Sequence, residues 1–242
     1  MERAGLDALL AGGRASYRYL TGHRSVQFAI DKRPMLVLLP LVGPPARLVY
    51  GAEVAEAAAQ SWIEDVRGYP GRSPLEAGLV ADLLSGLGLG EATIGWELGP
   101  GQRPALPHST FEEVRRHLPG ARFVDGSAVL DACRLVKSDA EVLRVEEACR
   151  VACRGHRLAL ERMRPGLSVA ECERLVLAAM LEAGTDADPP PVLFFGGAAQ
   201  AHVYAEGEVL QLDFAVSLRG YRADLTRRAS FGAPGALHLR DH

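Results

Sequence analysis

The stretch that decides the fold is EVLQLDFAVSLRGYRADLTRRAS, residues 208–230. Apolar and polar residues alternate over 208–217, which is the pattern of a β-strand with one buried face, and 221–230 also has strand character. The short link 217–220 joins the two runs as an antiparallel hairpin. One face of the first strand would therefore pack on a core through Leu210, Leu212, Phe214 and Val216.

The other face of this hairpin carries Asp213 and Asp224, eleven residues apart. If the tip is Leu218-Arg219, the two carboxylates are direct cross-strand partners; if it is Arg219-Gly220, they are diagonal neighbours. Both registers place them on the same face. The sequence leaves the register open.

Two carboxylates on one face repel each other, so something must neutralise them. The candidates are one or two divalent cations, or the basic neighbours Arg222 and Arg228. Spacing alone favours the salt-bridged face, because short motifs arise often by chance. His202 lies just upstream in the small-residue segment 196–202 and could donate to an oxyanion or move a proton, although a lone histidine is more often an ordinary surface or core residue.

Two helices precede the hairpin. Ser138 to Glu141 and Ser168 to Glu171 are capping boxes, and they predict helices that run to about Arg164 and to just before Gly184. The first helix carries one stripe that could be three metal ligands or a buried apolar face. The buried face is favoured, because apolar residues share the stripe with Cys149, Cys153 and His156.

Residues 1–130 alternate strand-like and helical patterns, which predicts an α/β domain. The expected strands lie near Leu9 and over 35–39, 46–50 and 92–97. The expected helices cover about 74–87 and 110–118, with capping boxes at 73–76 and 109–112. The boundary near 131–138 divides the chain into domains 1–130 and 131–242.

Composition excludes several classes of protein. The chain has 242 residues, 48% of them hydrophobic, and a formal net charge of −3, so no excess of positive charge predicts nucleic-acid binding. The longest apolar run, 35–39, is too short to cross a membrane, and the N-terminus does not resemble a signal peptide. We therefore expect a cytoplasmic protein whose four cysteines are reduced.

The chain resembles the pita-bread metallohydrolases, which include Xaa-Pro aminopeptidase, prolidase and creatinase. The resemblance covers nearly the whole chain, and it rests on GLDALL (5–10), YLTG (19–22), IGWE (94–97), RLVKSDAE (134–141), RPGLS (164–168), DF (213–214) and GYRADLTR (220–227). It implies an α/β N-terminal creatinase-type domain followed by an incomplete α+β pita-bread domain.

The resemblance also implies a site. Asp213 would be a ligand to one metal, Asp224 would bridge two metals, and His202 would match a substrate-binding and proton-handling histidine. The implied metals are a pair of Mn, Co or Zn ions that activate a bridging hydroxide. The implied substrate is a peptide with proline at its second position, and the implied assembly is a homodimer through the N-terminal domain.

The chain departs from this family pattern in its ligand set. Eleven residues separate His202 from Asp213, fewer than in the family, and no glutamate follows Glu208, although the family site needs a further histidine and two glutamates downstream. His238, Asp241 and His242 lie too near the end to replace them. We therefore expect a fragment that binds metal weakly or not at all, and that is poorly soluble or inactive when expressed alone.

Three functions fit these observations. The first is a metal-dependent Xaa-Pro aminopeptidase or dipeptidase. The second is a creatinase-like hydrolase that cuts a C–N bond without metal, and the presence of both Asp213 and Asp224 argues against it. The third is a non-catalytic pita-bread protein that binds peptides or partners, since fold and function are separable.

Overall fold

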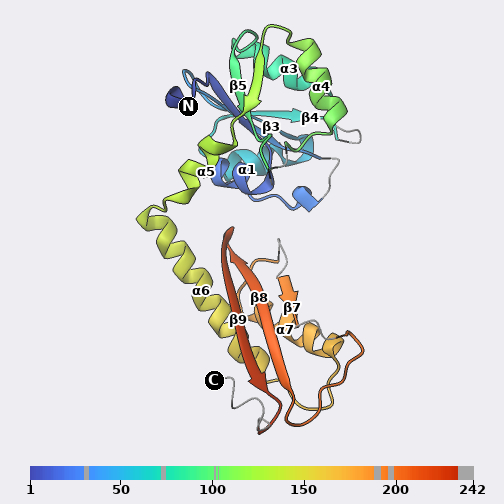
Figure 1. Ribbon diagram of the computed structural model, residues 1–242. Coiled ribbons are helices and arrows are strands. Elements are labelled where there is room, and N and C mark those ends of the chain that lie inside the picture. Colours follow the sequence, from blue (N-terminus) through green and yellow to red (C-terminus); the bar gives the residue numbers. More distant parts are fainter. Residues whose placement is uncertain are drawn as a thin grey trace. The chain divides into compact units, whose positions relative to one another are not determined.

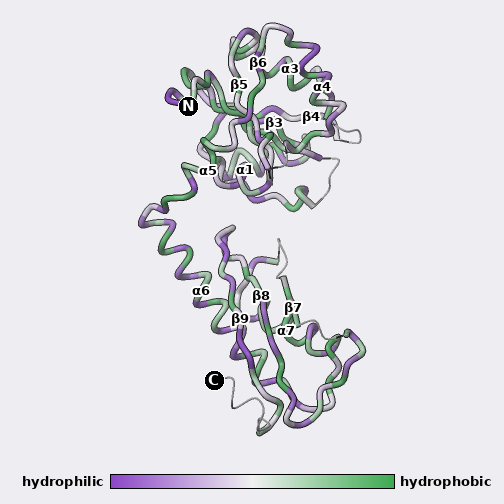
Figure 2. Tube along the Cα trace, viewed as in Figure 1, coloured by the Kyte–Doolittle hydropathy of each residue, from purple (hydrophilic) through white to green (hydrophobic). Residues whose placement is uncertain are grey.

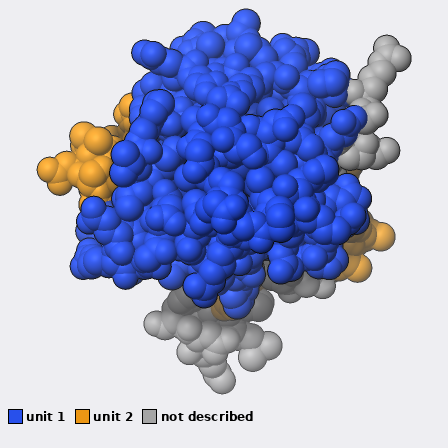
Figure 3. Space-filling model, turned by 90° about the horizontal axis from the view of Figure 1, so that it is seen from above, with its two compact units in different colours: residues 1–136 blue, residues 137–242 orange. Residues whose placement is uncertain are grey.

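The computed structural model describes residues 1–29, 33–71, 75–100, 102, 104–187, 192–195 and 199–233. The chain divides into two compact units, which are Met1–Val136 (unit 1) and Lys137–His242 (unit 2). Figure 3 shows the two units in different colours. Each unit has hydrophobic cores of its own.

Unit 1 is built on a mixed sheet whose strand order is β4-β3-β2-β1-β5-β6. The strands are β1 (Ala8–Ala11), β2 (Leu36–Pro40), β3 (Ala46–Tyr50), β4 (Asp65–Tyr69), β5 (Thr93–Trp96) and β6 (Arg122–Asp125). β2 pairs antiparallel with β1 and with β3, and the other pairs are parallel. The predicted α/β class is confirmed.

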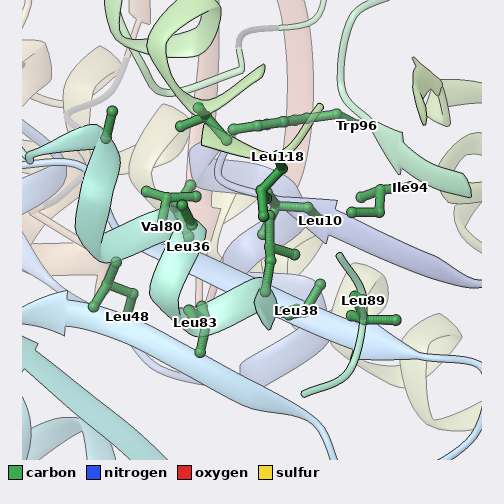
Figure 4. Close-up of a cluster of buried hydrophobic side chains, with 14 of the residues drawn as sticks. Leu10, Leu36, Leu38, Leu48, Val80, Leu83, Leu89, Ile94, Trp96 and Leu118 are labelled. Carbon is green, nitrogen blue, oxygen red and sulfur yellow. The ribbon is translucent and has the colours of Figure 1, made fainter. Parts of the chain in front are cut away.

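Helices cover both faces of this sheet (Figure 1). They are α1 (Arg14–Thr21), α2 (Val54–Ala59), α3 (Ala77–Gly86), α4 (His108–His117) and α5 (Ser127–Leu135), with short 3-10 turns at Glu2–Ala4, Val26–Ala29 and Gly51–Glu53. One core joins the sheet to α3 and α4, and Figure 4 shows several of its leucines together with Val80, Ile94 and Trp96. The core on the other face includes Tyr17 of α1, Ala57 of α2 and Leu130 of α5.

The sequence predicts two capping boxes in unit 1, and the described residues include only one of them completely. The box at Ser109 is wrong, because α4 begins at His108, two residues earlier than predicted, and its N-cap is Pro107, whose carbonyl accepts a hydrogen bond from the amide of Phe111 at 3.0 Å. Ser73 and Pro74 of the other box lie outside the described residues. α3 follows Glu76 without a side-chain cap.

Unit 2 packs two helices on one face of a three-stranded antiparallel sheet of order β7-β8-β9. Its elements are α6 (Asp139–Leu160), α7 (Val169–Ala183), β7 (Val192–Phe194), β8 (Val209–Leu218) and β9 (Tyr221–Ser230). Both predicted capping boxes, at Ser138 and Ser168, are confirmed. α7 ends just before Gly184, as predicted, and the φ of 100° at Gly184 suits glycine. α6 ends at Leu160, four residues before the predicted end.

The helices α6 and α7 approach closely through small residues. A Cβ at Gly155 would lie 2.4 Å from the Sδ of Met180, so any side chain there would have to displace Met180. The buried positions of α6 are Ala148, Ala152, Gly155 and Ala159. None of the helices in the described part of the chain is long and apolar enough to cross a membrane.

The predicted buried stripe of α6 is wrong for its two cysteines, since Cys149 and Cys153 are exposed. The stripe of buried residues is offset by one position, so these thiols follow the small residues that contact α7. His156 is half-buried and stacks on Phe214 with ring centroids 5.6 Å apart.

Candidate functional site

The hairpin of β8 and β9 forms over its whole predicted length. Ten residue pairs join the strands, from Val209 with Ser230 to Leu218 with Tyr221. The two-residue turn between them is Arg219-Gly220, with φ of 52° and 89°. Positive φ at both positions is typical of the tight turns that match the twist of hairpin strands. The turn fixes the register that the sequence leaves open.

In this register Asp213 and Asp224 are diagonal neighbours. Asp213 lies opposite Thr226, and Asp224 lies opposite Ala215. Diagonal side chains on one face are about 7–8 Å apart, which is close enough for two carboxylates to share bound cations. Asp213 stands on the central strand of the sheet and Asp224 on an edge strand.

The two faces of β8 differ sharply in burial. Leu210, Leu212, Phe214 and Val216 are each 1% exposed and join the core beneath α6 and α7. Hydrophobic and hydrophilic colours alternate along the strand in Figure 2. The carboxylates therefore point away from the helices, because successive side chains of a strand face opposite sides.

The polar partners of the two carboxylates show whether basic side chains neutralise this face or leave it open to divalent cations. Asp213 is partly buried, and its Oδ1 accepts a hydrogen bond from the Thr226 hydroxyl at 2.9 Å. Asp224 is exposed. Among the described residues neither carboxylate forms an ion pair, and Arg228 donates to the Gln211 amide oxygen at 3.3 Å instead. The salt-bridged interpretation thus finds no support in these residues.

A buried polar network holds the turn of the hairpin. The amide of Asp186 donates to the Ser217 carbonyl at 2.6 Å, and its Oδ2 accepts from the Ser217 hydroxyl at 3.3 Å and from the Gly220 amide at 3.1 Å. Thr185 donates its hydroxyl to the same Ser217 carbonyl at 2.9 Å. The segment that follows α7 therefore sets the position of the strands that carry both aspartates.

His202 lies at the other end of the hairpin. Its side chain is 40% exposed, and its Nε2 is 3.3 Å from Glu208 Oε1. Its ring meets Tyr204 edge-on, with centroids 5.0 Å apart. The His202 carbonyl accepts from the Val169 amide at 2.9 Å, which ties the segment to the start of α7. Residues 196–198 of the small-residue segment lie outside the described residues.

The structure brings together two of the three predicted site residues. Asp213 and Asp224 share one open face, whereas Glu208, the partner of His202, is five residues from Asp213, or about 17 Å of extended strand. Within the described ranges, no three His, Cys, Asp or Glu side chains gather to hold a metal ion. Two carboxylates suit a divalent cation. His238, Asp241 and His242 also lie outside them.

The sequence interpretation missed the supporting residues. Asp186 and Thr185 are 9% and 8% exposed, and Thr226 orients the carboxylate of Asp213. A polar pair directly after the helix-ending Gly184 is the signal that could have suggested Asp186. Its partner Ser217 is 31 residues away, and local patterns do not predict such a contact.

Comparison with protein families matches both units. The model of the creatinase/prolidase N-terminal domain matches residues 1–136, and that of metallopeptidase family M24 matches residues 144–241. An uncharacterized hydrolase/peptidase of Sinorhizobium fredii is 27% identical over 263 residues, which cover 100% of the chain and 65% of that protein. The ectoine hydrolase of Halomonas elongata is 24% identical over 269 residues, which cover 99% of this chain and 65% of that protein.

Solved structures share the fold. The Xaa-Pro dipeptidase of Bacillus anthracis has a TM-score of 0.78 at 21% identity, covering 99% of this chain and 64% of that one. The X-Pro aminopeptidase of Thermotoga maritima has a TM-score of 0.78 at 19% identity, and the match covers 99% of this chain and 65% of that one. The chain spans 62–65% of the length of the curated relatives it matches. It belongs to the pita-bread family of M24 metallopeptidases, with a creatinase/prolidase N-terminal domain followed by a partial M24 domain.

Proposed function

We propose that this chain contributes Asp213 and Asp224 to the site of a metal-dependent hydrolase that cuts Xaa-Pro peptide bonds, as an aminopeptidase or a dipeptidase. One observation carries the proposal. The two carboxylates lie on one open face of the hairpin, and among the described residues no arginine or lysine pairs with either. Such a face is stabilised by divalent cations.

The chain's own residues would hold the metal in a defined place. Asp213 would bind one ion of a Mn, Co or Zn pair and Asp224 would bridge the pair, while Thr226 limits the rotation of the Asp213 carboxylate through its 2.9 Å hydrogen bond. The metal, when bound, would supply an activated water and polarise the scissile carbonyl. The contact of Asp186 with the hairpin turn would keep the carboxylates in register.

We assign His202 the role of binding substrate and handling a proton. Its imidazole is exposed, and its Nε2 lies 3.3 Å from Glu208 Oε1. A carboxylate partner fixes which ring nitrogen carries the proton and how the ring is oriented. In this role His202 would reach the reacting groups through bound substrate, because it does not contact either aspartate in the described structure.

A second candidate is the hydrolysis of a small molecule. It is favoured by the match to the Halomonas elongata ectoine hydrolase over 99% of the chain. A creatinase-like reaction without metal and a non-catalytic peptide-binding role are the remaining alternatives. We also propose that the chain forms a homodimer through its N-terminal domain, for which sedimentation should give twice the mass of one chain.

The test measures hydrolysis of an Xaa-Pro dipeptide, a matched dipeptide without proline, and ectoine, each with Mn, Co or Zn. Turnover would overturn the expectation that the chain is inactive when expressed alone, and the proposal requires any such turnover to prefer the Xaa-Pro bond and to fall to background with a chelator, Asp213→Asn or Asp224→Asn. The control Glu146→Gln changes an exposed carboxylate of the same unit and should have no effect. Turnover that survives both aspartate substitutions contradicts the proposal. Peptide binding without turnover or metal dependence favours the non-catalytic role.

A further inference from the structure

Unit 1 contains a cationic side chain in its interior. Arg47 of β3 is 0% exposed. Its neighbours Ala46 and Leu48 join the core under α3 and α4, so Arg47 faces the opposite side of the sheet, where Val49 packs with residues of α1 and α2. The guanidinium group keeps its charge at every physiological pH. A charged group in a protein interior needs a partner of opposite charge.

The hydrogen bonds of Arg47 use one of its three nitrogens. Nη2 donates to the carbonyls of Ala57 and Ile63, at 3.0 Å each. Nε and Nη1 are buried, and neither makes a well-aligned hydrogen bond to a described residue; the side-chain oxygen beside the guanidinium is the neutral hydroxyl of Tyr17. Both carbonyl partners are neutral, so these contacts orient the guanidinium without compensating its charge.

A histidine in the same region adds another unused donor. His23 and Tyr17 are both 0% exposed, and the Tyr17 hydroxyl lies 3.1 Å from His23 Nδ1. Burial raises the pKa of Tyr17 to about 12, against the opposing effect of Arg47, so the phenol keeps its proton and donates it to Nδ1. Nε2 then carries the ring hydrogen, and it has no hydrogen-bond partner among the residues that the structure describes. The unused groups around Tyr17 are all donors.

No carboxylate in the described part of the chain forms an ion pair with Arg47. Glu53 is 6% exposed and accepts from the Ser25 hydroxyl at 2.5 Å. Burial raises the pKa of Glu53, which weakens it further as a counter-charge. A water molecule could accept from these donors, but it would leave the charge uncompensated and would itself need acceptors. An anion accepts hydrogen bonds and also balances the charge.

We propose that unit 1 binds a small monovalent anion of chloride size at Arg47, as an internal structural ligand. The anion accepts hydrogen bonds from the free N–H groups of the guanidinium and lies on the side of the sheet occupied by His23 and Tyr17. The site is independent of the carboxylate face in unit 2. Because the folded chain binds the anion and the unfolded chain does not, halide raises the stability of unit 1 by mass action.

The experiment follows thermal unfolding of the full chain by tryptophan fluorescence, because both tryptophans, Trp62 and Trp96, belong to unit 1. Chloride replaces gluconate at constant ionic strength. The expected result is a midpoint that rises linearly with the logarithm of chloride concentration once the site is half-filled. Arg47→Met should abolish this dependence, while Arg115→Met, at an exposed arginine of the same unit, should retain it.

Crystals grown in bromide provide a second readout that needs no variant. The proposal expects an anomalous bromide peak within hydrogen-bond distance of the Arg47 guanidinium in the wild-type chain. A chloride dependence equal in wild type and Arg47→Met would overturn the proposal. Water without halide at Arg47 would overturn it too. If Arg47→Met does not fold, the bromide peak decides.

Discussion

Replacing Asp186 with alanine tests whether the segment after α7 holds the hairpin. The side chain is 9% exposed, and its Oδ2 accepts hydrogen bonds from the Ser217 hydroxyl at 3.3 Å and the Gly220 amide at 3.1 Å. A hydrogen bond to a charged group contributes about 1.5–3 kcal/mol, and bonds of this length belong near the lower end. We therefore expect Asp186→Ala to destabilise unit 2 by about 2–4 kcal/mol, and Asp186→Asn by about half as much, since the amide keeps an acceptor oxygen.

Hydrogen exchange measured by mass spectrometry on peptides from 209–230 reads this loss directly. A loss of 2–4 kcal/mol corresponds to a roughly 30- to 700-fold fall in protection of the hairpin amides, at about 1.4 kcal/mol per tenfold. Tryptophan fluorescence supplies an internal control, because Trp62 and Trp96 lie in unit 1 and their unfolding transition should not move. Glu146→Ala, on the exposed surface of α6, is the matched variant. Hairpin protection that is the same in Asp186→Ala and Glu146→Ala would refute the reasoning.

Three other predictions follow from single contacts. Gly155→Val places side-chain atoms where a Cβ already lies 2.4 Å from Met180 Sδ, so we expect overpacking to cost about 1–3 kcal/mol in urea unfolding of unit 2. Glu97 is 1% exposed and accepts hydrogen bonds from two backbone amides at the start of α1, at 2.7 and 2.8 Å. Glu97→Ala leaves both amides unpaired, so we expect the free energy of unfolding of unit 1, followed by tryptophan fluorescence, to fall by about 2–5 kcal/mol. Burial, and then the charge of Arg227, lower the pKa of His156 below 6.5. The unfolded chain then binds that proton more readily, so stability should fall as pH drops through 6.5, and His156→Phe should reduce this slope in urea unfolding followed by circular dichroism.

The features that the sequence predicts well are encoded over a few residues. The capping boxes at Ser138 and Ser168 form as expected, because each needs only a side chain three residues away. The hairpin forms because alternation and the Arg219-Gly220 turn are both local. The face shared by Asp213 and Asp224 follows from the two-residue period, which is the same in either register.

The features that the sequence does not predict depend on distant contacts. Asp186 reaches across 34 residues to the Gly220 amide and supports the turn that sets the register, and no local pattern marks this contact. Glu97 reaches 85 residues back to the start of α1, so the IGWE motif supports a helix that no local pattern marks. The exposure of Cys149 and Cys153 depends on which stripe of α6 meets α7, and apolar periodicity alone places that stripe one residue away.

The most direct test of the central claim is a titration of the chain with Mn²⁺ followed by electron paramagnetic resonance, in which bound manganese loses the sharp six-line signal of the free ion. Asp213 and Asp224 together form the metal-binding face in this account. We predict weak binding to the wild-type chain, as expected for two carboxylates without the rest of a ligand set, that Asp213→Asn and Asp224→Asn each abolish and that Glu146→Gln leaves unchanged. Manganese binding that is equally strong in all four proteins, or absent from the wild type, would contradict the account.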